Sequence, residues 1–428
     1  MIISDIKEFF SFLKPSNIKG WFNVENLFLN YFWLCTISAL IKLTLDKDWL
    51  ITILFPLVLY AIFIKKYKPK RLNTIDVFWY IEIIWIIITW MVNSYPNKGI
   101  LIFKCMTQEV AFMLAYCITR YSKKDYLKII IQKAYKPLVI TCVIGIYCFF
   151  FEPSWYARRT VGMADQIYGT VKDRDTVLEL WRLKSIFAST YTLAYFCAIT
   201  LIYEFYMMFT SNIDWLDNKK YRILLMLLLI VTSLFCMMRA PIAGVIGGFI
   251  SAYYYSIKYI RGGNATKYIV VGGIFVCFAA VLLISYMDQS LVDFMFSKVD
   301  AFTNSDSNFI EDRLFLQMQS LTLFGEGFGR YSNYANNFGM PILPDGEYMK
   351  IIAEQGFVGL SIILCLFISG LLKGLKHFRH LYLEFSILCM LVICMIGADP
   401  LSIYDKHCFI YWIALGQISR YYVKERSI

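Results

Sequence analysis

The sequence predicts an all-α polytopic membrane protein with about twelve transmembrane helices. Its residues are 59% hydrophobic and 18% aromatic, and its mean hydropathy is +0.56, well above the values typical of soluble domains. Apolar runs long enough to cross about 30 Å of hydrocarbon recur along the whole chain. They lie at roughly 25–44, 49–64, 75–93, 99–119, 131–151, 186–209, 222–239, 241–257, 268–287, 350–372, 384–398 and 407–420.

The connections between these runs predict one integral membrane domain over residues 1–428. Most are short, and we find neither an internal repeat nor a separate soluble domain. The segment 1–20 is mixed polar and amphipathic rather than basic and then apolar, so we expect the first hydrophobic helix to act as its own insertion signal.

Basic residues predict the orientation, because lysine and arginine are retained on the cytoplasmic side of a membrane. They follow the second, fourth and sixth spans, at 65–71, 120–128 and 219–222. We therefore expect both termini in the cytoplasm. The same rule accounts for the formal charge of +11, so the charge does not indicate a nucleic-acid partner.

Cysteine and histidine usage argues against a metal or disulfide framework. The 12 cysteines lie in or beside apolar runs and are expected to pack as small hydrophobic residues. Of the 3 histidines, His407 alone falls on the predicted outer side, which gives little support to a histidine zinc site or a Ser-His-Asp arrangement. No nucleotide-binding motif is present, so we expect no cofactor and no metal.

Two long connections, 152–185 and 288–349, are predicted on the outer, non-cytoplasmic side. Long loops in compact proteins are usually functional or disordered. The second loop enters the stretch FGEGFGRYSNYANNFGMPILPDGEYMKIIAEQGFVGL at 324–360, which opens with alternating glycines. We expect Asp345 to be a helix N-cap and Glu347, Lys350 and Glu354 to share one helical face. This stretch is our candidate active site.

Arginines are unusually frequent on the predicted outer side. They are Arg158, Arg159, Arg174, Arg182, Arg239, Arg313 and Arg330. Because a guanidinium matches phosphate oxygens bidentately, such a set could hold a diphosphate without a metal. The alternative is that they contact lipid headgroups or pair with nearby acids. Arg239 stands out, since it lies in a predicted tight hairpin, Arg239-Ala240-Pro241, between two apolar helices, where an unpaired charge is costly.

Acidic residues also fall inside predicted spans, and intramembrane charges are candidate functional groups. Glu82 lies in the third span and Glu109 in the fourth. They could belong to a proton or ion relay, or Lys104 could be a structural partner of either one. Small residues at 243, 244, 247 and 248 predict close helix packing in the eighth span.

Three motifs follow one another along the second half of the chain. They are 182–194 (RLKSIFASTYTLA), 237–244 (MMRAPIAG), and a third that combines Glu311-Asp312-Arg313 with GEGFG at 325–329 and EQGFVG at 354–359. In this order they resemble the motifs of the bacterial O-antigen polymerase and ligase superfamily. The resemblance covers roughly residues 180–372. It implies a polytopic glycosyltransferase of the GT-C type in the bacterial inner membrane, acting on polyprenyl-diphosphate-linked glycans. Ligases of this family carry a histidine before the final motif, where this chain has Asp345-Gly346-Glu347, and this difference favours a polymerase.

The resemblance implies roles for individual residues. Arg182, Arg239 and Arg313 would hold the lipid diphosphate, and Arg313 would also stabilise the leaving charge. We expect Arg330, from the same loop as Arg313, to bind the diphosphate as well. Asp345 or Glu347 would be the general base. We expect Tyr348 and Glu354 to contact the glycan acceptor. Implied partners are an undecaprenyl-diphosphate-linked oligosaccharide, membrane lipids and a protein that regulates chain length.

The expected reaction joins lipid-linked repeat units into a surface polysaccharide on the periplasmic face without metal or nucleotide. Two alternatives remain open. One is an O-antigen ligase that transfers the glycan to the lipid A core. The other is a transporter, such as a flippase for lipid-linked oligosaccharides, which would be expected to show related halves and broken helices.

Overall fold

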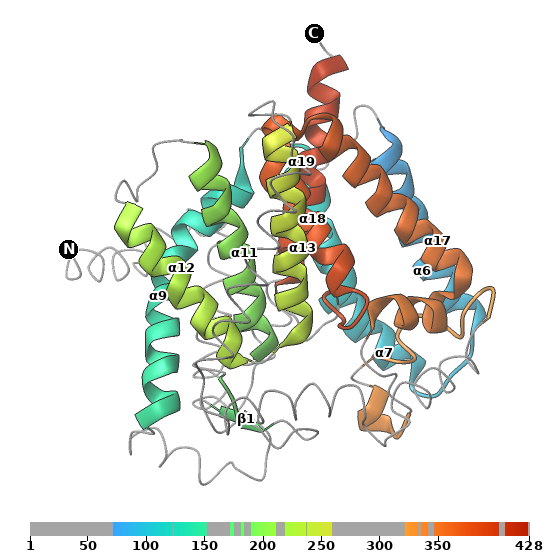
Figure 1. The fold of residues 1–428 in the computed structure, drawn as a ribbon. Coiled ribbons are helices and arrows are strands. Elements are labelled where there is room, and N and C mark those ends of the chain that lie inside the picture. The colour runs from blue at the N-terminus through green and yellow to red at the C-terminus, as the bar shows by residue number, and fades with distance from the viewer. Residues whose placement is uncertain are drawn as a thin grey trace, which may run out of the picture.

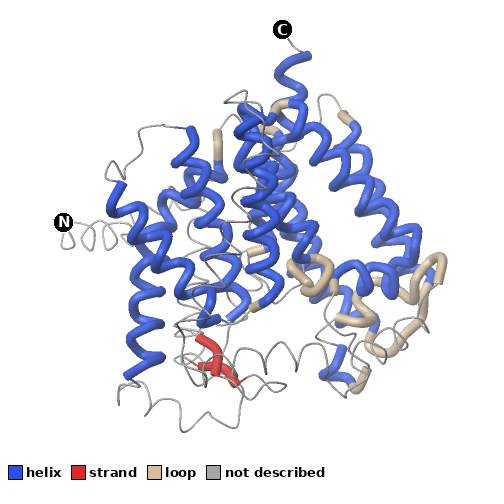
Figure 2. The backbone as a smooth tube through the Cα atoms, viewed as in Figure 1, coloured by secondary structure: helices blue, strands red, loops and turns tan. Residues whose placement is uncertain are grey.

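The computed structural model describes residues 72–122, 124–151, 172–174, 181–183, 190–210, 219–236, 238–258, 322–332, 335–340, 346–401 and 407–426. Within these ranges the chain is built almost entirely of helices, as Figure 2 shows. This architecture fits an all-α membrane protein. The predicted spans at 25–44, 49–64 and 268–287 lie outside the described residues, as do Arg313 and Asp345.

The described helices follow the predicted apolar runs closely. They are α6 (Thr74–Val92), α7 (Lys98–Cys105), α8 (Ala111–Arg120), α9 (Tyr126–Phe151), α11 (Thr190–Thr210), α12 (Lys219–Cys236), α13 (Arg239–Ser256), α17 (Glu347–Lys376), α18 (Phe378–Cys394) and α19 (Cys408–Arg426). A π-helical segment, η2 (Met106–Val110), joins α7 to α8, and a short 3-10 turn, η4, covers Ala335–Phe338. Three described helices, α6, α9 and α17, are long and apolar enough to cross a membrane.

One short hairpin interrupts the helices. Strands β1 (Lys172–Arg174) and β2 (Trp181–Leu183) pair antiparallel, with Asp173 opposite Arg182. The hairpin belongs to the first predicted outer loop. In Figure 1 it lies at the bottom of the bundle, and the C-terminal end of α19 lies at the top.

The core is a set of packed helix pairs. α13 packs on α18, α8 on α19, α6 on α17, and α11 lies against α12 and α13. The small residues of α13 bring it close to α18, since a Cβ added at Gly244 would lie 2.4 Å from Cys394 Sγ and one at Gly248 would lie 3.1 Å from the Ser386 carbonyl oxygen. The glycines therefore permit the close contact that their spacing predicts.

Two local expectations need correction. The tight hairpin predicted at Arg239-Ala240-Pro241 is the first turn of α13, because α12 ends at Cys236 and α13 begins at Arg239. A proline is tolerated there because the first turn needs no amide donor. The N-cap of α17 is Gly346 rather than Asp345, so the helix begins three residues before the predicted span and the loop predicted to end at 349 is shorter.

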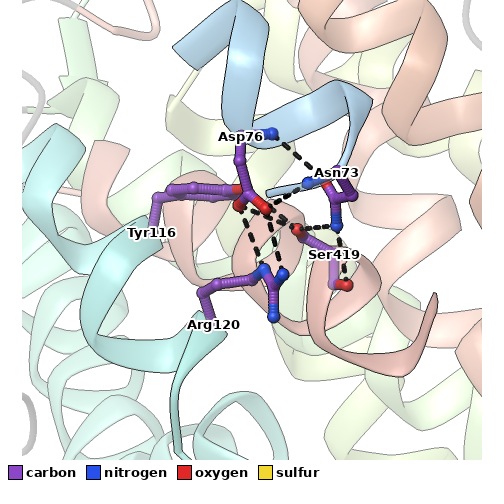
Figure 3. Close-up of polar contacts among 5 residues, drawn as sticks. All are labelled: Asn73, Asp76, Tyr116, Arg120 and Ser419. Atoms are coloured by element: carbon purple, nitrogen blue, oxygen red, sulfur yellow. Dashed lines mark hydrogen bonds and ion pairs between the residues drawn. The ribbon is translucent and has the colours of Figure 1, made fainter. Parts of the chain in front are cut away.

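A buried ion pair joins α6 to α8, and hydrogen bonds extend it to α19. Arg120 Nε and Nη2 each lie 3.0 Å from an oxygen of Asp76, and both side chains are almost fully buried. Tyr116 also donates to Asp76, and the Ser419 hydroxyl bonds to Tyr116 and to Asn73 (Figure 3). Asn73 and Asp76 cap α6 reciprocally. The network therefore fixes the start of α6 to the ends of α8 and α19.

Candidate functional site

The candidate site surrounds the start of α17, at the end of the bundle that also holds β1 (Figure 1). Backbone bonds attach this start to the segment after α18. The Glu347 amide donates to the Ala398 carbonyl at 3.0 Å, and the Gly346 amide donates to Asp399 Oδ1 at 2.9 Å. These bonds satisfy amides that a helix N-terminus leaves without intrahelical partners, so the side chains that follow are held in place.

α17 is broken at Gly356, whose φ of 74° and ψ of −177° are not helical. The break leaves backbone groups on both sides without their helical partners. Residues 322–327 supply the missing bonds, because the amides of Glu326 and Gly327 donate to the carbonyls of Ala353 and Glu354 at 2.8 and 3.0 Å. In return the amides of Phe357 and Val358 donate to the carbonyls of Thr322 and Leu323.

The glycine run of the loop makes this docking possible. Gly325, Gly327 and Gly329 all have positive φ, a region that favours glycine. A Cβ on Gly325 would lie 2.4 Å from the Glu354 carbonyl oxygen, and one on Gly356 would lie 2.2 Å from the Leu323 carbonyl oxygen. Because glycine has no side chain, the backbone of the loop can contact the backbone of the broken helix directly at both positions.

Lys350 is the buried centre of the site. Its Nζ lies 3.0 Å from Glu109 Oε1, and the charges of Glu354, Glu347 and Asp399 also act on it. Glu109 belongs to η2, and π-helical segments often occur at functional sites. One cation thus lies among four carboxylates.

Two of these carboxylates are oriented by backbone donors. Glu347 Oε2 accepts from the Leu401 amide at 3.0 Å, and Glu354 Oε1 accepts from the Tyr331 amide at 2.9 Å. Both side chains are at least 95% buried. In the described part of the chain, Glu347 Oε1 makes no hydrogen bond, which leaves this oxygen able to accept from a ligand.

The predicted site residues have separate outcomes in the structure. Glu347 and Glu354 come together around Lys350. Arg330 forms a partly exposed ion pair with Glu326 at 3.1 Å, so an anionic ligand would compete with that carboxylate. Tyr348 donates its hydroxyl to the Val392 carbonyl at 2.9 Å and lies against α18.

The predicted arginines are only partly placed. Arg182 lies in β2 and Arg239 opens α13, and the structure places both through their backbone. The start of α13 and the β1–β2 hairpin both lie at the end of the bundle that carries the site (Figure 1). Arg313 and Asp345 fall outside the described residues.

Sequence reasoning missed Lys350 as the partner of Glu109, because the two are 241 residues apart. It considered Lys104, which is near in sequence. It also missed Asp399, although this acid follows a predicted span directly. Charged residues are scarce in and beside apolar runs, so each of these charged residues could have been treated as a candidate site residue from the sequence.

Tyr331 borders the site from the loop and donates its hydroxyl to Glu326. Burial, followed by this hydrogen bond and the Glu326 charge, raises the pKa of Tyr331 above its ordinary range. The phenol therefore stays protonated and helps to hold Glu326 beside Arg330.

No protein-family model matches this chain, and no curated protein matches its sequence.

Proposed function

We propose that this chain is a membrane glycosyltransferase that polymerises undecaprenyl-diphosphate-linked oligosaccharide repeat units into a surface polysaccharide. It would be a twelve-span protein of the bacterial inner membrane with both termini in the cytoplasm and its site on the periplasmic face. The observation that carries the proposal is the cluster of Glu347, Glu354 and Glu109 around Lys350. Glu347, Lys350 and Glu354 lie within the region of motif resemblance, and the glycine loop docks on α17 beside them.

In the proposed reaction an acceptor sugar hydroxyl attacks the anomeric carbon of the donor glycan. The new glycosidic C–O bond forms as the bond to the lipid diphosphate breaks, and undecaprenyl diphosphate leaves with the bonding electrons. Glu347 takes the hydroxyl proton through its Oε1 atom as general base. The Leu401 amide holds the other oxygen of Glu347, and the positive charge of Lys350 favours the ionised carboxylate.

The leaving diphosphate would be stabilised by arginines, as developing charge is in other transferases. Arg182 and Arg239 are the candidates on described backbone, and Arg313 is the candidate in the second loop. Arg330 would join them by exchanging Glu326 for a phosphate oxygen. No metal or nucleotide takes part in this scheme.

The test compares two neutral variants in cells that lack the chain's own gene. Glu347→Gln keeps the shape of the side chain and removes the base, so we expect single repeat units in place of long chains. Glu384→Gln is the matched control, since Glu384 of α18 is equally buried but accepts a hydrogen bond from Gln417 of α19 and is not part of the Lys350 cluster. Long chains in the Glu347→Gln strain, with the protein present in the membrane, would overturn the role of Glu347.

A flippase for lipid-linked oligosaccharides is a second candidate, and a specific observation favours it. The break in α17 at Gly356 and the π segment that carries Glu109 resemble the discontinuous helices of transporters. The two functions predict different products. A polymerase raises the mass of the lipid-linked glycan, whereas a flippase changes only the leaflet in which it lies.

A further inference from the structure

A second buried acid, Glu82, lies outside the Lys350 cluster and has a different environment. It falls in the middle of α6, on the side that packs against α17. Its partner there is Gln355, the residue just before the break at Gly356. Glu82 is 2% exposed and Gln355 is 4% exposed, so both side chains are removed from solvent.

Contacts across the two helices bring these side chains together. The Gln355 side chain lies close enough to the Glu82 carboxyl group to interact with it. One turn along α6, Trp85 Nε1 donates to the Gln355 carbonyl at 2.9 Å. Gly359 leaves room for the amide, because a Cβ there would lie 2.9 Å from Gln355 Oε1.

Two oxygens of this pair find no hydrogen-bond donor in the described part of the chain. Glu82 Oε2 and Gln355 Oε1 are both buried and have no partner there. Both are acceptors when Glu82 is ionised, so neither can satisfy the other. Leaving such atoms unpaired in a membrane interior is costly.

Among the described residues Glu82 forms no ion pair, in contrast to Glu109 and Asp76. The charged groups on the packed elements are engaged elsewhere: Lys350 with Glu109, Glu354 with the Tyr331 amide, Glu326 with Arg330, and Asp76 of α6 itself with Arg120. An isolated carboxylate within a membrane-spanning helix is strongly unfavourable.

We propose that Glu82 and Gln355 form an intramembrane proton-binding site. A proton on Glu82 Oε2 removes the isolated charge and becomes the donor that Gln355 Oε1 lacks, which closes a two-bond ring between the acid and the amide. A metal cation fits less well, because hard cations take six or more oxygen ligands and the pair offers two unpaired oxygens. Losing the proton would place two acceptors against each other beside the α17 break, so protonation is coupled to the geometry of that break. The proposal is independent of the glycosyltransferase assignment.

Infrared spectroscopy of the full chain in lipid nanodiscs tests this site. At neutral pH we expect a protonated-carboxyl band in the wild type that is lost in Glu82→Gln, a variant that keeps a hydrogen-bonding pair with Gln355. Glu109→Gln is the control and should retain the band, because Glu109 is ion-paired. An unchanged band in Glu82→Gln, or no such band in the wild type, would overturn the proposal.

A second variant keeps the test decisive if Glu82→Gln does not fold. Gln355→Leu retains Glu82 but removes the amide, so the carboxyl band should shift to the frequency of a less strongly hydrogen-bonded acid. A band at the wild-type frequency in Gln355→Leu would show that the amide is not its partner and would contradict the proposed pair.

Discussion

Single charged residues have very different energetic roles at the two ends of this bundle. Asp76 and Arg120 are fully buried and form two parallel hydrogen bonds. Removing one member of such a pair leaves an uncompensated buried charge. Arg330 and Glu326 are partly exposed, and water compensates the loss of such a pair.

Replacing Asp76 by Asn should therefore destabilise the folded protein by about 3–5 kcal/mol. Glu326→Gln, the control, should cost about 0–1 kcal/mol. Thermal unfolding in detergent, followed by size-exclusion chromatography, compares the two variants. Equal losses of stability would mean that the Asp76–Arg120 pair is not the clamp that its geometry indicates.

The buried acids show which properties of a site residue can be predicted from sequence and which cannot. Placing an acid in an apolar run predicts that Glu82 and Glu109 are buried, and both are largely buried. Their partners, Gln355 and Lys350, lie on α17, far along the chain. Such pairings depend on how the helices pack, which hydropathy alone does not encode.

Among the helices, α17 is the element that organises the candidate site. Its break at Gly356 is stabilised by the loop 322–327, which replaces the lost helical bonds with loop bonds. Unsatisfied backbone groups are not tolerated in lipid, so the broken helix and the glycine loop depend on each other.

This dependence predicts different effects for two glycine substitutions. Both Gly325 and Gly339 have positive φ, so alanine at either costs about 1–2 kcal/mol. At Gly325 the new Cβ would also lie 2.4 Å from the Glu354 carbonyl oxygen, whereas at Gly339 nothing lies within 4 Å. We expect Gly325→Ala to lose clearly more thermal stability.

Hydrogen exchange provides a direct measurement of the same loop. The amides of Glu326 and Gly327 should be protected in the wild type and in Gly339→Ala, and should exchange faster in Gly325→Ala. Equal protection in both variants would contradict the docking of the loop on α17.

At the level of elements, the sequence predicted the described helices to within a few residues at most boundaries. An apolar run of this length forms a helix in a membrane because a helix satisfies its own backbone hydrogen bonds. It did not predict the break at Gly356 or the π segment at Met106–Val110. Glycine in an apolar run is also common in regular membrane helices, so Gly356 carries no distinctive local signal. The break depends on a loop that arrives from another part of the chain.

On the scale of the whole molecule, features predicted on one side of the membrane gather at one end of the bundle. The β1–β2 hairpin and α7 lie at the bottom of Figure 1, whereas the C-terminal end of α19 lies at the top. Basic residues following the even-numbered spans predict that this top end faces the cytoplasm.

This orientation predicts the labelling of two exposed positions by a membrane-impermeant maleimide. Asn97→Cys, before α7, should react in cells whose outer membrane alone has been opened. Lys124→Cys, between α8 and α9, should react only after the inner membrane is permeabilised. The wild-type chain measures the background from its own cysteines, and the reverse pattern would invert the proposed topology.

The central claim is that the acids around Lys350 catalyse glycan polymerisation. Its most direct test is the purified chain in proteoliposomes supplied with a single lipid-linked repeat unit. We expect the wild type and Glu384→Gln to produce a ladder of longer lipid-linked glycans, and Glu347→Gln to produce at least about 100-fold less, the lower range for loss of a general base. A wild-type protein that moves the substrate between leaflets without raising its mass would contradict the polymerase and favour the flippase.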